Sequence, residues 1–142
     1  RIEGYYAGIA MFQDYPILGV GIGGFVKYRV EKVDGIALNA HNLIGQVLGE
    51  TGLLGLSTFL FLVVSVLIRT KVIRRMARIR PSPGCIMYEK LAFAIRDSIL
   101  ILFFTGLFGH NLYRFNWLWL AAFSVLLFRF CEDAMRQEDN IS

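Results

Sequence analysis

A histidine stands where a polar segment of the chain meets a long apolar run. The sequence reads Ala40-His41-Asn42, and residues 51–68 then contain no charged side chain. An ionisable side chain at the edge of a bilayer is costly to bury, so it is by default a hypothesis of a functional site. His41 is therefore the first candidate for chemistry, and a polar cap on a helix end is the alternative interpretation.

The composition indicates a membrane protein. The 142 residues are 56% hydrophobic and 18% charged, whereas a typical soluble domain is about 45–50% apolar and about 25% charged. The length allows about three spans of roughly 20 residues each. The chain begins within a polar segment and without a signal-peptide pattern, so we expect it to be the C-terminal part of a longer protein.

Positive charge is concentrated directly after the apolar run. Six cations fall within residues 69–80: Arg69, Lys71, Arg74, Arg75, Arg78 and Arg80. A basic segment that follows a membrane span is typical of the cytoplasmic side. A nucleic-acid patch is the alternative. We favour the membrane interpretation and expect no nucleic-acid partner.

These patterns predict an all-α, polytopic transmembrane fold. We expect residues 1–42 to form an external, periplasmic segment with an interfacial helix, a Gly-rich turn and a loop over residues 27–40. The spans are predicted at residues 43–68, 91–109 and 112–130. Residues 69–90 are predicted to be a basic cytoplasmic loop and residues 131–142 a cytoplasmic tail. Three passages place both His41 and His110 on the non-cytoplasmic side.

Glycines mark one face of the first predicted span. Gly45, Gly49 and Gly52 follow His41 at helical spacing. Small residues on one face let another helix or a lipid chain approach the backbone. Glu50 is predicted to point to the opposite side of the helix, so it cannot form a simple side-by-side pair with His41.

The segment from Gly19 to Gly24 matches the dinucleotide-binding pattern G-x-G-x-x-G. No βαβ pattern surrounds it and no acidic residue follows about 20 positions later, so we reject nucleotide binding. A turn that needs unusual backbone angles is the better interpretation.

The order of these motifs resembles the bacterial O-antigen ligase and O-antigen polymerase family. It consists of Arg1, then Asp14-Tyr15-Pro16-Ile17-Leu18-Gly19-Val20-Gly21, then His41-Asn42, then Glu50-Thr51-Gly52. The resemblance covers about residues 1–67. Where the family has a tryptophan near the arginine, this chain has Tyr5 or Tyr6.

The resemblance implies glycan transfer at the outer face of the bacterial inner membrane. The donor would be a glycan on undecaprenyl diphosphate, and the acceptor would be lipid A-core or another glycan chain. His41 matches the essential histidine and Arg1 matches the arginine that contacts the diphosphate. Positions with a structural role in the family are matched by Pro16, Gly19, Gly21, Glu50 and Gly52.

The chemistry accounts for these residue types. An acceptor hydroxyl must lose a proton as it attacks the anomeric carbon, and histidine is the side chain that titrates nearest neutral pH. A guanidinium can hold phosphate oxygens bidentately. We therefore predict a metal-independent transferase without a cofactor, and we expect this segment to be inactive alone. Further substrate-binding candidates are Asn42, Arg29, Lys27, His110 and Arg114.

Other functions remain open. Polymerisation of O-antigen or exopolysaccharide is an alternative within the family. The same spans could belong to a transporter of lipid-linked sugars, with His41 as a gate or proton relay. A membrane anchor without chemistry is the third possibility. For Lys27 and Arg29 the alternative is a solvated loop balanced by Glu31 and Asp34, and for His110 it is a polar hairpin tip.

Overall fold

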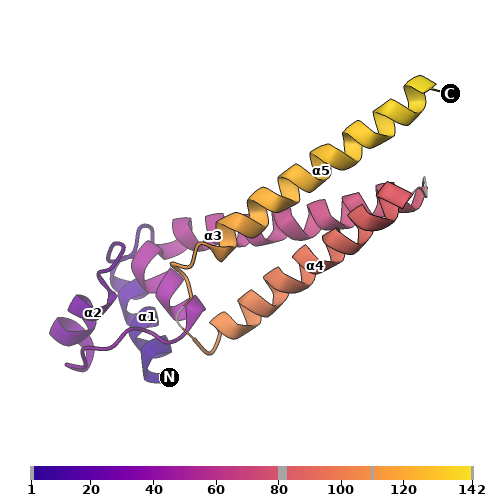
Figure 1. Ribbon diagram of the computed structural model, residues 1–142. Helices are drawn as coiled ribbons and strands as arrows, with labels where there is room; N and C mark the ends of the chain where they lie inside the picture. The colour runs from indigo at the N-terminus through magenta and orange to yellow at the C-terminus, as the bar shows by residue number, and fades with distance from the viewer. Residues whose placement is uncertain (1, 80–82, 110, 142) are drawn as a thin grey trace. The chain divides into compact units, whose positions relative to one another are not determined.

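The computed structural model describes residues 2–79, 83–109 and 111–141, and within these it is all-helical. Two compact units are present: unit 1 comprises residues 1–61 and 102–114, and unit 2 comprises residues 62–101 and 115–142. The predicted all-α class is confirmed. In chain order the elements are α1 (Ile2–Asp14), α2 (Phe25–Tyr28), the π-helix η1 (Arg29–Val33), α3 (Leu43–Ile79), α4 (Pro83–Gly106) and α5 (Asn116–Ile141) (Figure 1).

In unit 1, α1 packs closely against the first part of α3. The buried residues of α1 are small or flexible: Gly4, Ala7, Gly8 and Met11. A Cβ atom on Gly8 would collide with the carbonyl oxygen of Gly45, and a Cβ on Gly49 would lie 2.9 Å from the sulfur of Met11. The prediction that the glycine face admits another helix is therefore confirmed for Gly45 and Gly49, whereas Gly52 has non-helical backbone angles and contacts Ile17 and Gly19 instead. Three large side chains of α1 point outward: Ile2 is 72% exposed, Tyr6 63% and Tyr5 39%.

Among the described residues, α3 is the one helix that is long and apolar enough to cross a membrane. Only 17% of its most apolar 18-residue window is buried, which distinguishes it from the core helix of a soluble protein. α4 and α5 are long enough, with 24 and 26 residues, but they do not contain a described window that is sufficiently apolar and free of charge. The structure therefore supports one of the three predicted spans.

The structure differs from the prediction in the segments expected to be loops. The basic residues 69–79 continue α3, and α4 begins at Pro83 rather than after residue 90. α5 extends through Ile141, so the expected tail is helical, and α2 and η1 occupy part of the expected loop 27–40. The physical reason is that lysine, arginine, alanine and methionine are good helix formers. Their charge predicts the side of a membrane and not the backbone conformation.

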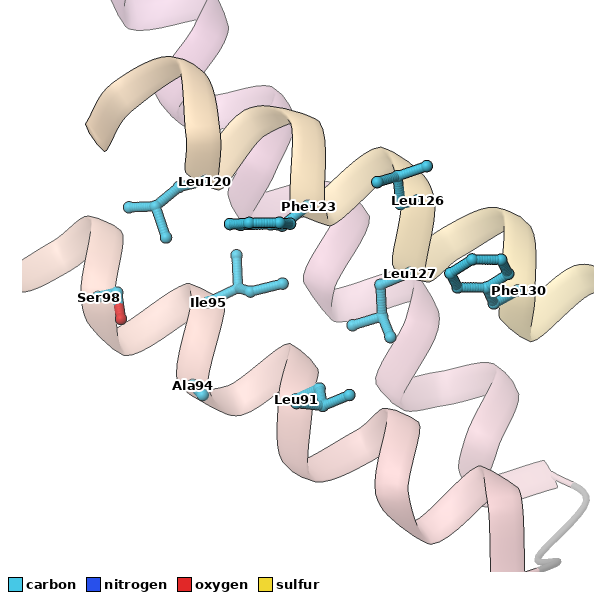
Figure 2. Close-up of a pocket in the computed structure, with 9 residues that line it drawn as sticks. All are labelled: Leu91, Ala94, Ile95, Ser98, Leu120, Phe123, Leu126, Leu127 and Phe130. Carbon is cyan, nitrogen blue, oxygen red and sulfur yellow. The ribbon is translucent and has the colours of Figure 1, made fainter. Parts of the chain in front are cut away.

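Unit 2 contains α3 from Leu62 onward, α4 as far as Ile101, and α5. Its core contains Ile73, Ala92, Leu127 and Cys131. An apolar groove of about 440 Å³ lies between α4 and α5, where Leu120, Phe123 and Leu127 face Leu91 and Ile95 (Figure 2). Contiguous exposed apolar surface is typical of contact with lipid or with another protein segment.

Candidate functional site

The segment that follows α1, residues 16–21, forms a turn that docks into a break in α3. Gly52 has φ 62° and ψ −156°, which divides α3 into two helical pieces. The carbonyl oxygens that end the first piece accept hydrogen bonds from the turn: Val20 N–H donates to Gly49 at 2.9 Å and Gly21 N–H to Glu50 at 3.0 Å. A helix end leaves its last carbonyls without partners, and here the turn supplies them.

The same turn also provides hydrogen-bond partners for the second helical piece, but here the turn accepts and the helix donates. The Leu53 N–H donates to the Pro16 carbonyl at 2.9 Å and the Leu54 N–H donates to the Ile17 carbonyl at 3.2 Å. The first N–H groups of a helix also lack partners within it. The turn and the break therefore satisfy each other, which gives a physical role to the predicted structural positions Pro16, Gly19, Gly21, Glu50 and Gly52.

Two glycines make this docking possible. Gly19 has φ 68° and its Cα lies against the backbone of Glu50 and Thr51. A Cβ on Gly52 would lie 2.6 Å from the carbonyl carbon and oxygen of Ile17. Positive φ is unfavourable for residues with a Cβ, so the expectation of unusual backbone angles in this turn is confirmed.

Glu50 lies directly beneath the docked turn and is 1% exposed. Its Oε1 accepts the Phe25 backbone N–H at 3.3 Å, and its Oε2 accepts the Gln46 side-chain amide at 3.3 Å and the Tyr113 hydroxyl. Burial, followed by the hydrogen bond to Glu50, raises the pKa of Tyr113. The hydroxyl therefore stays protonated and donates. The Glu50 side chain thus joins three separate segments of unit 1.

His41 and Asn42 form the entry to α3. The Asn42 Oδ1 accepts the Gly45 N–H at 2.9 Å, which is a helix N-cap. The Asn42 Nδ2 donates to the Leu107 carbonyl at 2.9 Å and ties the start of α3 to the segment after α4. His41 is exposed and has φ 47°, a left-handed conformation that histidine adopts more often than most residues. Left-handed backbone at a residue other than glycine is often found at functional sites.

A groove of about 470 Å³ adjoins this entry. Asn42 contributes its polar wall, while Leu107 and Phe108 line it from the segment after α4. The remaining lining residues come from α1: Ile2, Tyr5 and Tyr6. The outward-facing aromatic residues of α1 therefore share this groove with Asn42, the residue that follows His41. A concave site with apolar and aromatic walls and a few polar groups is typical of ligand-binding sites.

The predicted cationic residues have different environments. Arg29 is 3% exposed, and its guanidinium donates to both carboxyl oxygens of Asp34 at 2.7–3.0 Å and to the Leu38 carbonyl at 3.4 Å. Its hydrogen bonds thus hold residues 29–38 together, which favours a structural role. Lys27 and Arg114 are exposed. Arg1 and His110 lie outside the described residues, so their predicted roles stay predictions.

The Arg29–Asp34 pair makes the stability of this segment depend on pH. The hydrogen bond from Arg29 lowers the pKa of Asp34 below its usual 3.8. The stabilisation is therefore present above pH 3.8 and is lost as the pH falls through the lowered value. We expect the Ile36 and Leu38 amides to lose hydrogen-exchange protection, corrected for intrinsic rates, when the pH is lowered below 3.8. Asp34→Asn should remove this protection already at pH 6, and equal protection in both proteins at pH 6 would contradict it.

The Asn42 cap gives a second test of the entry to α3. We expect Asn42→Ala to lower the free energy of unfolding by about 1–2 kcal/mol, because it removes an N-cap and a second hydrogen bond. Asn39→Ala is the matched control, because no side-chain hydrogen bond forms at Asn39 among the described residues; it should stay within about 0.5 kcal/mol. Thermal unfolding in detergent measures both, and equal stability of the two variants would contradict the assignment.

Some residues of the site could not be recognised in advance. Tyr113 is 63 positions from Glu50 in sequence, and no local pattern links the two. Gln46 carries a weak signal, because it precedes Glu50 by one helical turn on the same helix. Among the described residues, no three His, Cys, Asp or Glu side chains gather closely enough to hold a metal ion.

The geometry thus brings Asn42 to an aromatic groove, with the exposed His41 directly before it in the chain. Glu50 and Arg29 do not line this groove and are buried structural groups. Comparison of the chain with protein-family models, with curated proteins and with solved structures finds no match.

Proposed function

We propose that this chain is part of a membrane glycosyltransferase of the O-antigen ligase type. The donor is a glycan on undecaprenyl diphosphate, and the acceptor is lipid A-core or the end of another glycan chain. The motif order Asp14-Tyr15-Pro16, His41-Asn42 and Glu50-Thr51-Gly52 supports the proposal. The docking of the first motif into the break beside the third gives these motifs a common structural purpose.

The observation that carries the proposal is an exposed histidine that directly precedes Asn42, a residue that lines the groove. His41 is held in a left-handed conformation next to the Asn42 cap. The groove beside Asn42 is lined by Tyr5 and Tyr6. Aromatic faces with hydroxyl tips suit a sugar, which presents both C–H and O–H groups. In the proposed reaction His41 is the general base at the acceptor.

The transfer step is a substitution at the anomeric carbon. The acceptor oxygen forms the new C–O bond while its proton moves to the His41 imidazole, and the bond from the anomeric carbon to the phosphate oxygen breaks. The leaving undecaprenyl diphosphate keeps the electron pair, and the imidazolium afterwards releases its proton to solvent. Cations must balance the developing negative charge on the diphosphate, and Arg1 is the proposed partner, with Arg114 and Lys27 as exposed auxiliaries.

The membrane location is part of the same proposal. α3 is long and apolar enough to span a bilayer, and the basic run from Arg69 favours a cytoplasmic position for the end of this helix. We propose two further spans within α4 and α5, which present large apolar side chains to the outside, such as Phe104 at 62% and Leu118 at 62% exposure. His41 then faces the periplasm or the cell exterior.

Reconstitution of the full-length protein in proteoliposomes tests the function. The liposomes receive a glycan-diphosphate lipid donor and a hydroxyl acceptor, without added metal. We expect a covalent glycan–acceptor product and release of undecaprenyl diphosphate. Movement of the donor across the bilayer without bond formation would instead identify a transporter, and absence of both would leave the anchor role.

A further inference from the structure

Unit 2 contains a basic pocket that the proposed glycan transfer does not use. It measures about 570 Å³ and is formed by α3 between Leu67 and Ile79 together with one residue of α4. Its lining includes five cationic side chains: Lys71, Arg74, Arg75, Arg78 and Arg96. Five cations around one pocket of this size create a strongly positive field.

Protein carboxyl groups neutralise only part of this charge. Arg78 pairs with Glu89 at 2.6 Å and Arg96 with Asp97 at 2.6 Å. Within the part of the chain that the structure describes, Lys71, Arg74 and Arg75 have no carboxyl oxygen within ion-pair distance. Like charges three and four positions apart on one helix destabilise it, so an anion bound among these side chains would relieve their repulsion.

Aromatic stacking orients the guanidinium of Arg74, which lines the pocket. The Arg74 guanidinium carbon lies 3.6 Å from the centroid of the Phe93 ring, and that of Arg96 lies 4.7 Å from the same centroid. The Nε of Arg74 is buried and has no hydrogen-bond acceptor among the described residues. A stacked guanidinium keeps its N–H edge available for a planar or tetrahedral oxyanion. Arg74 therefore presents an oriented donor that lacks its acceptor.

We propose that this pocket binds the phosphate group of an anionic membrane phospholipid. The pocket begins at Leu67, where the charge-free stretch of α3 ends, and this is the level at which a lipid headgroup meets a membrane helix. Basic pockets at the cytoplasmic ends of membrane helices are typical sites for anionic headgroups. The inference rests on the membrane location proposed above and not on the transferase chemistry.

Lipid binding to the purified full chain in a neutral detergent tests the proposal. Fluorescently labelled phosphatidylglycerol is titrated, with phosphatidylcholine of the same acyl chains as the neutral comparison and inorganic phosphate as a competitor. We expect tighter binding of phosphatidylglycerol and no displacement by millimolar phosphate. Lys71→Gln/Arg75→Gln should weaken phosphatidylglycerol binding about 30-fold, as expected for the loss of two cations near a headgroup.

Three further variants distinguish a specific effect of the pocket on lipid binding from effects of net charge and of misfolding. Arg129→Gln/Arg136→Gln removes the same charge from exposed positions of α5 and should change the affinity less than about threefold. Lys71→Arg/Arg75→Lys should retain binding, and Arg75→Gln alone should weaken it about fivefold. Equal affinity for both lipids, equal loss in the two charge-removing double variants, or displacement by inorganic phosphate would overturn the proposal. Because no glycan donor is present, this result is independent of transferase activity.

Discussion

Gly52→Ala is expected to release the docked turn and to destabilise unit 1 by at least about 3 kcal/mol. The backbone angles of Gly52, φ 62° and ψ −156°, are adopted almost only by glycine. The added methyl group would also lie 2.6 Å from the Ile17 carbonyl and 2.7 Å from the Gly19 nitrogen. These backbone atoms cannot move away without breaking the hydrogen bonds that hold the turn. Hydrogen exchange at the Val20, Gly21, Leu53 and Leu54 amides should show loss of protection together.

Gly35→Ala is the matched control for this prediction. Gly35 also has a positive φ, 73°, but no atom lies within 4 Å of the position of an added Cβ. Its cost should therefore be the conformational term alone, about 1–2 kcal/mol. Equal destabilisation by the two substitutions would show that the contact between the turn and the break does not contribute, and this would contradict the described docking.

Replacement of His41 is expected to reduce glycan transfer by about 10²–10⁴-fold, the usual contribution of a general base. His41→Ala removes the imidazole but also places alanine at φ 47°. His41→Asn is the sharper variant, because asparagine tolerates the left-handed conformation while lacking a basic group. His41→Gly relieves the conformational constraint entirely. The rate of product formation in proteoliposomes is measured for all three variants.

Rescue distinguishes a base from a structural residue. Added imidazole should restore part of the activity of His41→Gly and should not affect Asn42→Ala, in which the base is retained and the cap is lost. The free energy of unfolding of each His41 variant should lie within about 1 kcal/mol of that of the parent protein, because surface substitutions seldom cost more. Transfer within tenfold of the parent rate in His41→Asn would remove His41 from the mechanism.

Much of unit 1 could be predicted from local signals. The end of α1 near Asp14 follows from Pro16, and the glycine face of residues 43–52 predicts a close helix contact that Gly8 and Gly45 confirm. The break at Gly52 could not be predicted, because the apolar sequence continues after this glycine without a proline, as in an unbroken membrane helix. The groups that stabilise the break are backbone N–H and C=O groups of residues 16–21. The sequence of α3 alone therefore gives no sign of the break.

The interactions of Glu50 and Arg29 show the same limit. Helical spacing predicts that Glu50 points away from His41, but its partner Tyr113 comes from a distant segment. For Arg29, the sequence offered a diphosphate contact or a solvated loop, and the structure shows a buried side chain paired with Asp34. Charge patterns in the sequence thus identify candidate groups, whereas burial and long-range packing decide what each one can bind.

The central claim is that His41 faces the non-cytoplasmic side of the membrane, where a lipid-linked diphosphate is available. The most direct test places a single cysteine at position 41 in the full-length protein, with Cys85 and Cys131 replaced by serine, and treats right-side-out spheroplasts with a membrane-impermeant maleimide. A cysteine at position 75 in the same background is the control for the cytoplasmic side. We predict labelling at position 41 in intact spheroplasts and at position 75 only after lysis. Labelling at position 41 only after lysis would contradict the proposed transferase.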